Sequence, residues 1–305
     1  MSLPQAITRR ALTKEDAEVV AALCGEDEAA FTGQPSQLSA NDVLAWWAGT
    51  DLENKSWLLE EDGRVVGVGW LEREDYGDLG TFVSVVAQGE KGRGLGAALL
   101  DIGEEAVLAT AAARLQTFAL GADTAAADLF RSRGYREVRR FYEMAIELDG
   151  PVEVPAVPDG LSLETFDESE ARPFHDAMDE AFGDHWEHHP FPFEQWWQEK
   201  RDAPDYDPTL WFVVRDGDEL AAVVRNESNR NGGGYVAALG VRRAWRRRGL
   251  ARLLLLHSFA EFQRRGQSRV TLGVDAESPT GATKLYDGVG MHVEMEMVVF
   301  EKARP

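Results

Sequence analysis

The feature that most constrains this chain is an internal repeat of about half its length. Val241 follows Val86, and Gly249 follows Gly94, by the same 155 positions (241 − 86 and 249 − 94). A pair of adjacent tryptophans and an acidic hairpin around a glycine also occur once in each half. A shared register over landmarks this far apart indicates a duplicated domain. We therefore expect two copies of one fold, each with its own core.

A proline-rich stretch separates the two copies. Residues 149–160 contain three prolines and have a glycine near each end, a composition typical of an extended linker. We predict an N-terminal domain at 1–148, the linker at 149–160 and a C-terminal domain at 161–305. The closing strand of the first copy is predicted near 141–148.

Composition and charge restrict the class of protein. The 305 residues are 44% hydrophobic and 28% charged, which is ordinary for a globular chain. The net charge is −21, and acidic residues are in excess in both halves, which disfavours nucleic acid as a partner. Cys24 is the single cysteine, so no intrachain disulfide can form. With charged residues at 8–16 in place of a signal peptide, and no apolar run long enough to span a membrane, we expect a cytoplasmic location.

A basic stretch stands out against this acidic background. Residues 236–241 read as a buried strand, and five of the seven residues at 242–248 are arginine. Gly249 follows, and apolar residues then recur at helical spacing from Leu250 onward. The first turn of a helix favours an anion, and a glycine there lets a phosphate approach the backbone. The stretch is therefore predicted to hold a pyrophosphate, whereas the alternative is an exposed, solvated arginine-rich loop.

The same stretch resembles a family signature. Residues 246–251 read Arg-Arg-Arg-Gly-Leu-Ala and match the pattern Q/R-x-x-G-x-G/A at a strand-to-helix junction. This is similar to the acetyl-coenzyme A signature of the GNAT N-acetyltransferase superfamily, and Ser278 and Tyr286 follow in the family's order, so the resemblance spans most of residues 235–300. It implies an α/β (α+β) class: two tandem GNAT folds, each a mixed twisted sheet with helices on both faces. Tandem GNAT repeats of this size also resemble the mycothiol synthases.

The resemblance implies acetyl-CoA as the cofactor and indicates which residues bind it. In the C-terminal copy these form the strand end, the basic turn, the helix start and a later serine where the family usually has asparagine: Leu239, Gly240, Val241, Arg246, Arg247, Arg248, Gly249, Leu250, Ala251, Arg252 and Ser278. The corresponding residues of the N-terminal copy form a possible second cofactor site: Val86, Lys91, Gly92, Arg93, Gly94, Leu95 and Gly96.

The resemblance also implies a catalytic acid. Tyr286 occupies the position from which the family's tyrosine protonates the departing thiolate, and a phenol with a pKa of about 10 suits that role. The alternative is a tyrosine with a purely structural role in the core. The matching position of the first copy is Phe130 (286 − 156), which cannot donate a proton. The N-terminal copy is therefore expected to be catalytically silent or mainly structural.

The base and the acceptor site are predicted less directly. Many relatives carry a glutamate on the strand that here spans residues 235–241, but this strand has no carboxylate. Glu227 is the first candidate for the base. The irregular loop after the first helix of the C-terminal copy is expected to contact the acceptor through Asp184, His185, Trp186 and Glu187. Its Asp184, His185 and Glu187, or a chain of waters, are alternatives for the base. No metal site is predicted, since surface histidines are more often solvated than ligating.

Together these features predict an acetyl-CoA-dependent N-acetyltransferase that acts in its C-terminal domain. We expect direct transfer to a primary amine of a small or cationic acceptor, because acidic surroundings attract a cation. One alternative is an acyl-CoA-binding sensor or scaffold without turnover, suggested by Phe130 and by the missing strand carboxylate. Another is a small-thiol acetyltransferase similar to mycothiol synthase. No nucleic acid or membrane partner is expected, and the sequence leaves the acceptor and the oligomeric state open.

Overall fold

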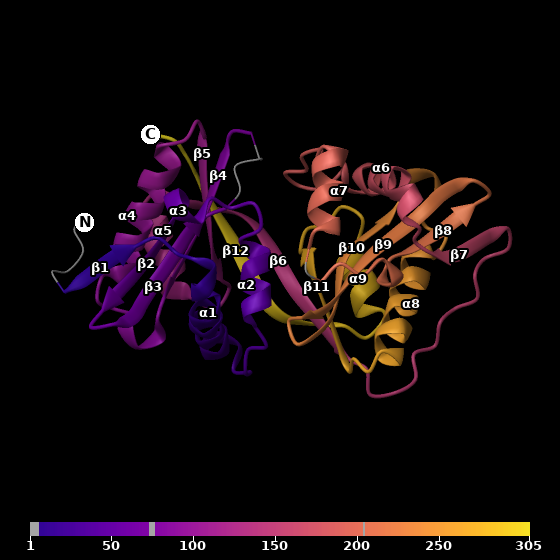
Figure 1. Ribbon diagram of the computed structural model, residues 1–305, viewed down its shortest axis with the longest axis horizontal. Coiled ribbons are helices and arrows are strands. Elements are labelled where there is room, and N and C mark those ends of the chain that lie inside the picture. Colours follow the sequence, from indigo (N-terminus) through magenta and orange to yellow (C-terminus); the bar gives the residue numbers. More distant parts are fainter. Residues whose placement is uncertain (1–5, 73–76, 204) are drawn as a thin grey trace. The chain divides into compact units, whose positions relative to one another are not determined.

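The chain folds into two compact units (Figure 1). The computed structural model describes three stretches of the chain: residues 6–72, 77–203 and 205–305. The first unit comprises Met1–Tyr142 together with Met295–Pro305, and the second comprises Glu143–Glu294. Each unit combines a mixed sheet with helices, so the predicted α/β class is confirmed. No described helix has the length and apolar character needed to cross a membrane.

The first unit has a sheet of mainly antiparallel strands. Its strands before the linker are β1 (Ile7–Arg10), β2 (Ser56–Glu61), β3 (Arg64–Leu71), β4 (Leu79–Val86) and β5 (Arg114–Leu120). Its helices are α1 (Ala17–Thr32), α2 (Ala40–Trp46), α3 (Leu52–Lys55), α4 (Leu95–Leu108) and α5 (Thr124–Ser132). β1 to β4 pair in order as antiparallel neighbours, and β4 pairs with β5 in parallel.

Helices cover both faces of this sheet. Successive residues of a strand point to opposite faces. On β4, Phe82 packs in a cluster with side chains of α4 such as Leu99, whereas Val83 packs in a second cluster with side chains of α1 such as Val20. The tight β2–β3 turn is made by Asp62 and Gly63, both with positive φ, as a two-residue hairpin requires.

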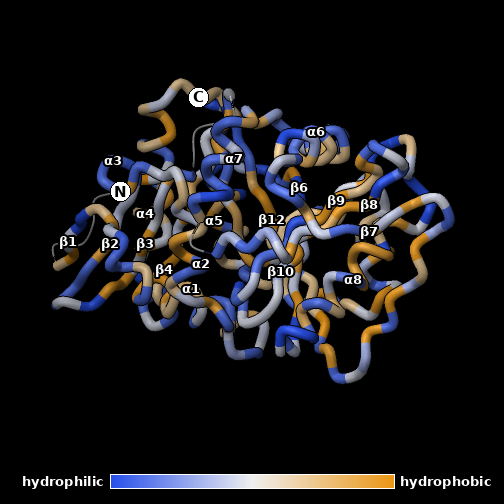
Figure 2. Tube along the Cα trace, turned by 45° about the vertical axis from the view of Figure 1, so that its right-hand side comes forward, coloured by the Kyte–Doolittle hydropathy of each residue, from blue (hydrophilic) through white to orange (hydrophobic). Residues whose placement is uncertain are grey.

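The second unit repeats this plan. Its strands are β7 (Leu161–Thr165), β8 (Phe212–Asp216), β9 (Glu219–Arg230), β10 (Gly233–Val241) and β11 (Arg269–Asp275). Its helices are α6 (Ala171–Phe182), α7 (Phe193–Arg201), α8 (Leu250–Arg264) and α9 (Ala282–Asp287). β7 to β10 are antiparallel neighbours, and β10 pairs with β11 in parallel. Figure 2 shows β8 and β9 largely in the hydrophobic colour, and most of their residues are buried.

The two faces of this second sheet are covered by different helices. Asn226 of β9 donates to the Ser258 hydroxyl of α8 at 2.9 Å, so its face packs on α8. Gly240 of β10 lies against Ala181 of α6 on the other face, where a Cβ added to the glycine would come within 2.8 Å of that alanine. In Figure 1, α6 and α7 lie on one side of these strands and α8 on the other.

The last strand of each unit comes from the other half of the sequence. β5 pairs antiparallel with β12 (His292–Ala303), and the neighbour of β11 is β6 (Arg136–Glu147). The strand predicted near 141–148 is thus part of β6, whose residues 143–147 belong to the second unit. The compact units therefore differ from the predicted domains by an exchange of closing strands. Each exchanged strand satisfies an edge that would otherwise leave a row of backbone groups unpaired.

Candidate functional site

The strand-to-helix turn of the second unit has the geometry of an anion site. After β10 a short 3-10 turn, Arg243–Trp245, leads to the start of α8 at Leu250. Arg247 and Gly249 have left-handed backbones, with φ of 64° and 79°. The first N–H groups of a helix have no partner within it, and the helix dipole favours negative charge there. Gly249 is exposed, and a Cβ built on it would meet no atom within 4 Å, so the turn is accessible to an anion.

One set of arginines in this region is bound within the protein. Arg242 Nε lies 2.6 Å from Glu180 Oε2 at the end of α6. Arg243 and Arg246 both pair with Asp184, at 2.7 and 3.1 Å. Although Arg246 and Asp184 were predicted to contact cofactor and acceptor, their side chains hold the turn against the segment after α6. The guanidiniums lower the pKa of Asp184, which makes this carboxylate a poor proton acceptor.

A second set of arginines remains available for a ligand. Arg247, Arg248 and Arg252 are exposed, and none of them forms an ion pair with a residue in the described part of the chain. They precede α8 or lie in its first turn, where a phosphate gains from both the helix dipole and nearby guanidiniums. A left-handed backbone at a non-glycine residue costs about 1–2 kcal/mol. Arg247 adopts that backbone at the entrance to the anion site.

β10 separates from β11 just before this turn. The two strands pair over only two positions, the second being Tyr235↔Thr271, although β10 continues to Val241 and β11 to Asp275. Residues 237–239 are half-buried even though their strand lies inside the sheet, and a register shift with β9 falls beside them. The main chain of β10 beyond Tyr235, here called the open segment of β10 (residues 237–241), therefore has no ladder partner in β11. Those of its N–H and C=O groups that are not bonded to β9 can pair with an extended ligand, although the Val241 carbonyl already accepts from Arg246 Nε at 3.2 Å.

Tyr286, the predicted acid, lies on α9 and interacts electrostatically with Tyr235 of β10. It is 8% exposed, and burial, with a smaller contribution from neighbouring Tyr235, raises its pKa to about 12. Tyr235 is the last residue of β10 that pairs with β11. The phenol of Tyr286 is therefore protonated at neutral pH, which is the state that a proton donor needs.

Glu227, the candidate base, is held between two arginines. Arg225 Nη1 donates to its Oε1, and Arg230 Nη1 lies 2.6 Å from its Oε2. Burial opposes ionisation of this carboxyl, but the two guanidiniums outweigh it and lower the pKa to about 2. Such a carboxylate accepts a proton only weakly near pH 7, which disfavours Glu227 as the base. Arg225 was not among the residues predicted from the sequence, although two residues at spacing i, i+2 on a strand share a face.

The predicted acceptor loop lies after α6. His185 packs its ring 4.5 Å from the ring of Phe182, and burial lowers its pKa, so the imidazole is neutral at pH 7. His188 Nε2 lies 2.9 Å from Asp179 Oδ1. Within the part of the chain that the structure describes, no group of three His, Cys, Asp or Glu side chains could hold a metal ion. The neutral imidazole of His185 is able to accept a proton at neutral pH.

The remaining predicted cofactor contact follows β11. Ser278 donates its backbone N–H to the carbonyl of Asp275 at 3.0 Å, and its hydroxyl lies 2.9 Å from the hydroxyl of Thr280. These bonds form a turn between the end of β11 and α9. The serine therefore has a structural role in the loop that carries Tyr286 toward β10.

The first unit has the same turn with its charges neutralised. Gly94 precedes α4 with φ of 82°, as Gly249 precedes α8. Lys91 Nζ lies 2.6 Å from Asp27 and 3.2 Å from Asp123. A cation already placed between two carboxylates has little attraction left for a phosphate.

Arg93 of this first turn is also occupied. Its guanidinium forms a pair of bonds with Glu61, both at 2.7 Å, and a further bond with Glu90. Gly92 and Ala97 stand where the second unit has Arg247 and Arg252 (155 positions apart). The possible second cofactor site therefore keeps the glycine turn, but its exposed arginine, Arg93, is paired with carboxylates.

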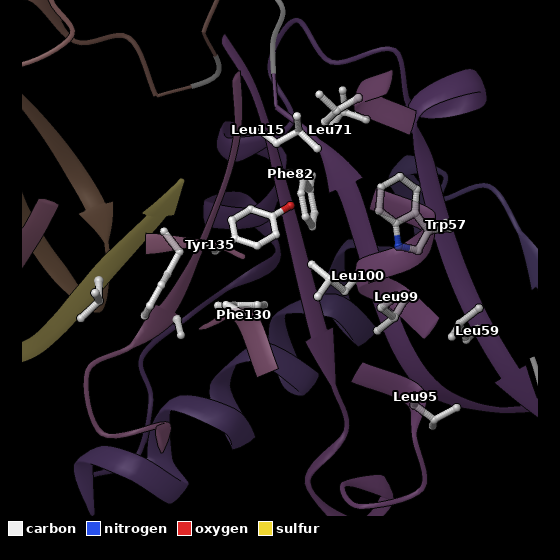
Figure 3. Close-up of a cluster of buried hydrophobic side chains, with 14 of the residues drawn as sticks. Trp57, Leu59, Leu71, Phe82, Leu95, Leu99, Leu100, Leu115, Phe130 and Tyr135 are labelled. Carbon is white, nitrogen blue, oxygen red and sulfur yellow. The ribbon is translucent and has the colours of Figure 1, made fainter. Parts of the chain in front are cut away.

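Phe130 lies in the core of the first unit. It is 7% exposed and packs its ring 6.0 Å from that of Tyr135 and 5.3 Å from that of Phe300. Figure 3 shows Phe130 and Tyr135 among the apolar side chains of this cluster, which include Phe82 and Leu100. The position that corresponds to Tyr286 thus contributes packing in the first unit.

Comparison with known proteins identifies the family. A sequence model described as the acetyltransferase (GNAT) family matches residues 171–291, and one described as an acetyltransferase (GNAT) domain matches residues 19–146. The chain belongs to the GNAT acetyltransferase family. It is therefore an acyltransferase with two GNAT domains, and acetyl-CoA is the acetyl donor that this family uses.

Several relatives and solved structures match this GNAT chain over almost its whole length. The mycothiol acetyltransferase of Thermobispora bispora is 31% identical over 91% of this chain and 93% of its own length, and that of Streptomyces avermitilis is 30% identical over 93% and 90%. A solved GCN5-related N-acetyltransferase from Sphaerobacter thermophilus has 33% identity and a TM-score of 0.86, covering 100% of this chain and 98% of its own. A tandem GNAT protein from the clavulanic acid biosynthesis pathway, at 18% identity and a TM-score of 0.76 over 98% and 99% of the two chains, shares the fold.

The residues of the second GNAT domain fit the acetyl donor of the family. Coenzyme A presents a diphosphate and an extended amide-containing arm. The left-handed turn at Gly249 and the exposed Arg247 and Arg248 suit the diphosphate. The open segment of β10 suits the arm, because its main chain has no ladder partner in β11.

Proposed function

We propose that this chain transfers the acetyl group of acetyl-CoA to a primary amine, and that the second unit performs the transfer. The observation that carries the proposal is the contrast between the two glycine turns. Arg247 and Arg248 are exposed and form no ion pair with the described residues, whereas Lys91 and Arg93 are bound to carboxylates. A diphosphate therefore gains more from the second turn.

The proposed roles follow from position and protonation. Arg247, Arg248 and Arg252, with the first N–H groups of α8, hold the diphosphate, and the open segment of β10 orients the arm. When bound, acetyl-CoA supplies the acetyl group as a thioester. Tyr286 keeps its proton at neutral pH and donates it to the sulfur as the carbon–sulfur bond breaks.

The attacking amine must lose a proton. Glu227 is a weak acceptor because its pKa is about 2, so we assign the proton to water or to the neutral imidazole of His185. His185 interacts electrostatically with Asp275 at the end of β11, which is the strand that separates from β10. Replacement of His185 by asparagine is a direct check of this assignment, since it removes the acceptor while the loop keeps a polar side chain.

The experiment that tests the proposal is thiol release from acetyl-CoA with a panel of primary amines. Release of thiol together with a mass-identified N-acetyl product supports acetyl transfer to an amine. A thermal shift with acetyl-CoA but no thiol release with any amine would favour the sensor without turnover. Because the donor is the same in every reaction, the panel separates donor binding from acceptor choice.

A second candidate is acetylation of a mycothiol precursor. It is favoured by the relatives named mycothiol acetyltransferase, which match this chain along 88% or more of its length at 28–31% identity in the cases from Thermobispora bispora, Acidothermus cellulolyticus and Thermomonospora curvata. The acceptor of those enzymes belongs in the amine panel. A kcat/KM for that acceptor well above those of all other amines would establish this candidate.

A further inference from the structure

A group of basic side chains lies on the face of β9 opposite to α8. Asn226 of β9 points to α8, so its neighbours Arg225 and Glu227 point to the other face. Arg230 pairs with Glu227 from the same strand. Lys200 of α7 interacts electrostatically with Arg225, Glu227 and Arg230, so α7 brings a further cation to this face. We call Lys200, Arg225 and Arg230, with Glu227 between the arginines, the basic cluster.

Positive charge dominates at this cluster. Each oxygen of Glu227 accepts a hydrogen bond from one guanidinium, Oε1 from Arg225 and Oε2 from Arg230. The repulsion from Arg225, together with burial, lowers the pKa of Lys200 to about 8, despite the opposing effects of Glu227 and Glu199. The positive charges of this half-buried cluster repel one another, so a bound anion would stabilise them.

Arg225 retains donors for such an anion. Within the described part of the chain its side chain makes one hydrogen bond, through Nη1 to Glu227, whereas a guanidinium carries five N–H donors. The group lies 5.9 Å from the centre of the Trp211 ring. Trp196 of α7 packs 6.1 Å from the same ring, and Lys200 is four residues further along that helix, on the same side. Trp211 thus lies beside the guanidinium fork of Arg225, which binds a carboxylate best through two parallel bonds.

The basic cluster is next to the place where acetyl transfer is proposed. Tyr235 stands directly opposite Glu227 in the β9–β10 ladder, and the guanidinium of Arg230 lies 4.5 Å above its ring. Tyr235 in turn interacts with Tyr286. β10 leaves β11 immediately after Tyr235, so the cluster lies beside the start of the open segment of β10.

We infer that the acceptor is an amine that carries a carboxylate, as an α-amino acid does, and that Arg225 and Lys200 bind this carboxylate. The inference rests on the proposed function and specifies its substrate class. This acceptor class replaces the cationic acceptor that was expected from the net charge of −21. The net charge of a protein affects how fast a charged ligand approaches, whereas the charges at the site decide which ligand binds. The carboxylate at the cluster leaves the amine of the same molecule directed toward the open segment of β10.

Matched pairs of acceptors test this inference. Phenylalanine is compared with 2-phenylethylamine, lysine with cadaverine, and each amino acid with its carboxamide, at a fixed acetyl-CoA concentration. A charge-assisted bond contributes about 1.5–3 kcal/mol, which corresponds to about a tenfold to hundredfold higher kcat/KM for the member with the carboxylate. Equal or faster acetylation of the decarboxylated amines overturns the inference while leaving acetyl transfer to amines intact.

Variants locate the effect. Arg225→Gln is expected to raise KM for the amino acid by about tenfold or more, and so to remove the preference for the amino acid over the matched amine. Arg225→Lys keeps the positive charge but lacks the guanidinium fork. This variant should therefore keep part of the preference for the amino acid. Arg264→Gln removes an exposed arginine of α8 that pairs with Glu261, and serves as the control that keeps the preference. A preference that survives Arg225→Gln in a protein with normal acetyl-CoA binding contradicts the assignment.

A binding measurement makes the test independent of turnover. Calorimetry with N-acetylphenylalanine and with N-acetyl-2-phenylethylamine, both in the presence of coenzyme A, compares the products directly. Tighter binding of N-acetylphenylalanine that is lost in Arg225→Gln supports the carboxylate site. Equal binding of the two products overturns it, even if no acceptor in the panel is acetylated.

Discussion

The two strand-to-helix turns of this protein have nearly the same backbone and different electrostatics. Gly94 and Gly249 precede their helices with φ of 82° and 79°. Lys91 lies between two carboxylates in the first unit, whereas Arg247 and Arg248 of the second unit are exposed and form no ion pair with the described residues. The turn itself is therefore a feature of the fold. Its ability to bind an anion depends on which cations the surrounding carboxylates leave available.

A second pair of equivalent positions differs in the same way. Glu72 and Glu227 are 155 positions apart (227 − 72); Glu72 directly follows β3, whereas Glu227 lies within β9. Burial raises the pKa of Glu72 to about 7, whereas Arg225 and Arg230 overcome burial and lower that of Glu227 to about 2. The first unit has Trp70 where the second has Arg225. The pKa of the neighbouring carboxyl is thus raised in the unit that has tryptophan at this position and lowered in the unit that has arginine.

The largest expected effect is on the tyrosine that distinguishes the units. Tyr286→Phe copies the residue of the first unit, and we expect kcat to fall by about 10²- to 10⁴-fold with little change in acetyl-CoA affinity, because only the proton donor is lost. Steady-state kinetics at saturating acceptor measure this. Tyr135→Phe, in the core of the first unit, is the matched control and should leave kcat unchanged. Full activity of Tyr286→Phe under chemistry-limited conditions would remove tyrosine from the mechanism.

The next effect is on binding at the turns. Replacing Arg247 and Arg248 by alanine should raise the Kd for acetyl-CoA by about 10- to 100-fold, with a smaller dependence on salt than the parent protein shows. Arg93→Ala in the first turn should leave the Kd unchanged, since its charge is already paired with Glu61 and Glu90. Isothermal titration calorimetry measures both. A weaker Kd in Arg93→Ala alone would place the donor in the first unit.

The two glutamates should respond to pH in opposite directions. The pKa of Glu72 is raised, so the native state holds its proton between about pH 4.5 and 7, and the stability from this group is lost as pH rises through 7. The pKa of Glu227 is depressed, so its contribution is present above about 4.5 and is lost as pH falls toward 2. At pH 8 we expect Glu72→Gln to stabilise and Glu227→Gln to destabilise the protein, each by about 1–3 kcal/mol.

Urea denaturation at several pH values measures this pair of effects. The difference between Glu72→Gln and the parent protein should vanish below about pH 4, where both forms are neutral. A destabilising Glu72→Gln at pH 8 would mean that its carboxylate has a stabilising partner. Parallel pH profiles for the two variants would show that the neighbouring arginines do not control Glu227.

The smallest expected effect is on stability at Arg247, where stability and acetyl-CoA binding should change in opposite directions. Arg247→Gly gives the second turn the glycine that the first has at Gly92, where φ is 82°. Relief of the left-handed backbone should raise the free energy of unfolding by about 1 kcal/mol, while loss of the guanidinium weakens acetyl-CoA binding. Thermal unfolding with and without acetyl-CoA reports both quantities. A variant that is less stable without ligand would show that the Arg247 side chain contributes to folding.

Much of the fold was predictable because its signals are local or periodic. The strand before Gly249, the glycine turn and the apolar spacing from Leu250 onward predict the β10–α8 unit, which the structure shows. The repeat predicts a second copy, and the structure has it. The exchange of β6 and β12 was not predictable, since both strands have similar length and either could satisfy the edges of β5 and β11.

The residues of the candidate site were likewise only partly predictable from the sequence. Sequence order identified the basic turn and Tyr286, because glycine, arginine and tyrosine occur there at the family's spacing. The carboxylates that bind some of these cations and leave others exposed are distant in sequence: Asp184 meets Arg246 across 62 positions, and Asp123 meets Lys91 across 32. A list of charges does not specify which of them become paired.

The sequence by itself determined that this is a duplicated GNAT protein, since the repeat and the family signature depend on residue type and spacing along the chain. Only the tertiary structure decided which arginines remain exposed, that Glu227 is ionised between two guanidiniums, and that Lys200 joins Arg225 near the open segment of β10. The physical reason is that the charge state and availability of a side chain depend on distance and burial, and folding brings together groups that the sequence keeps apart.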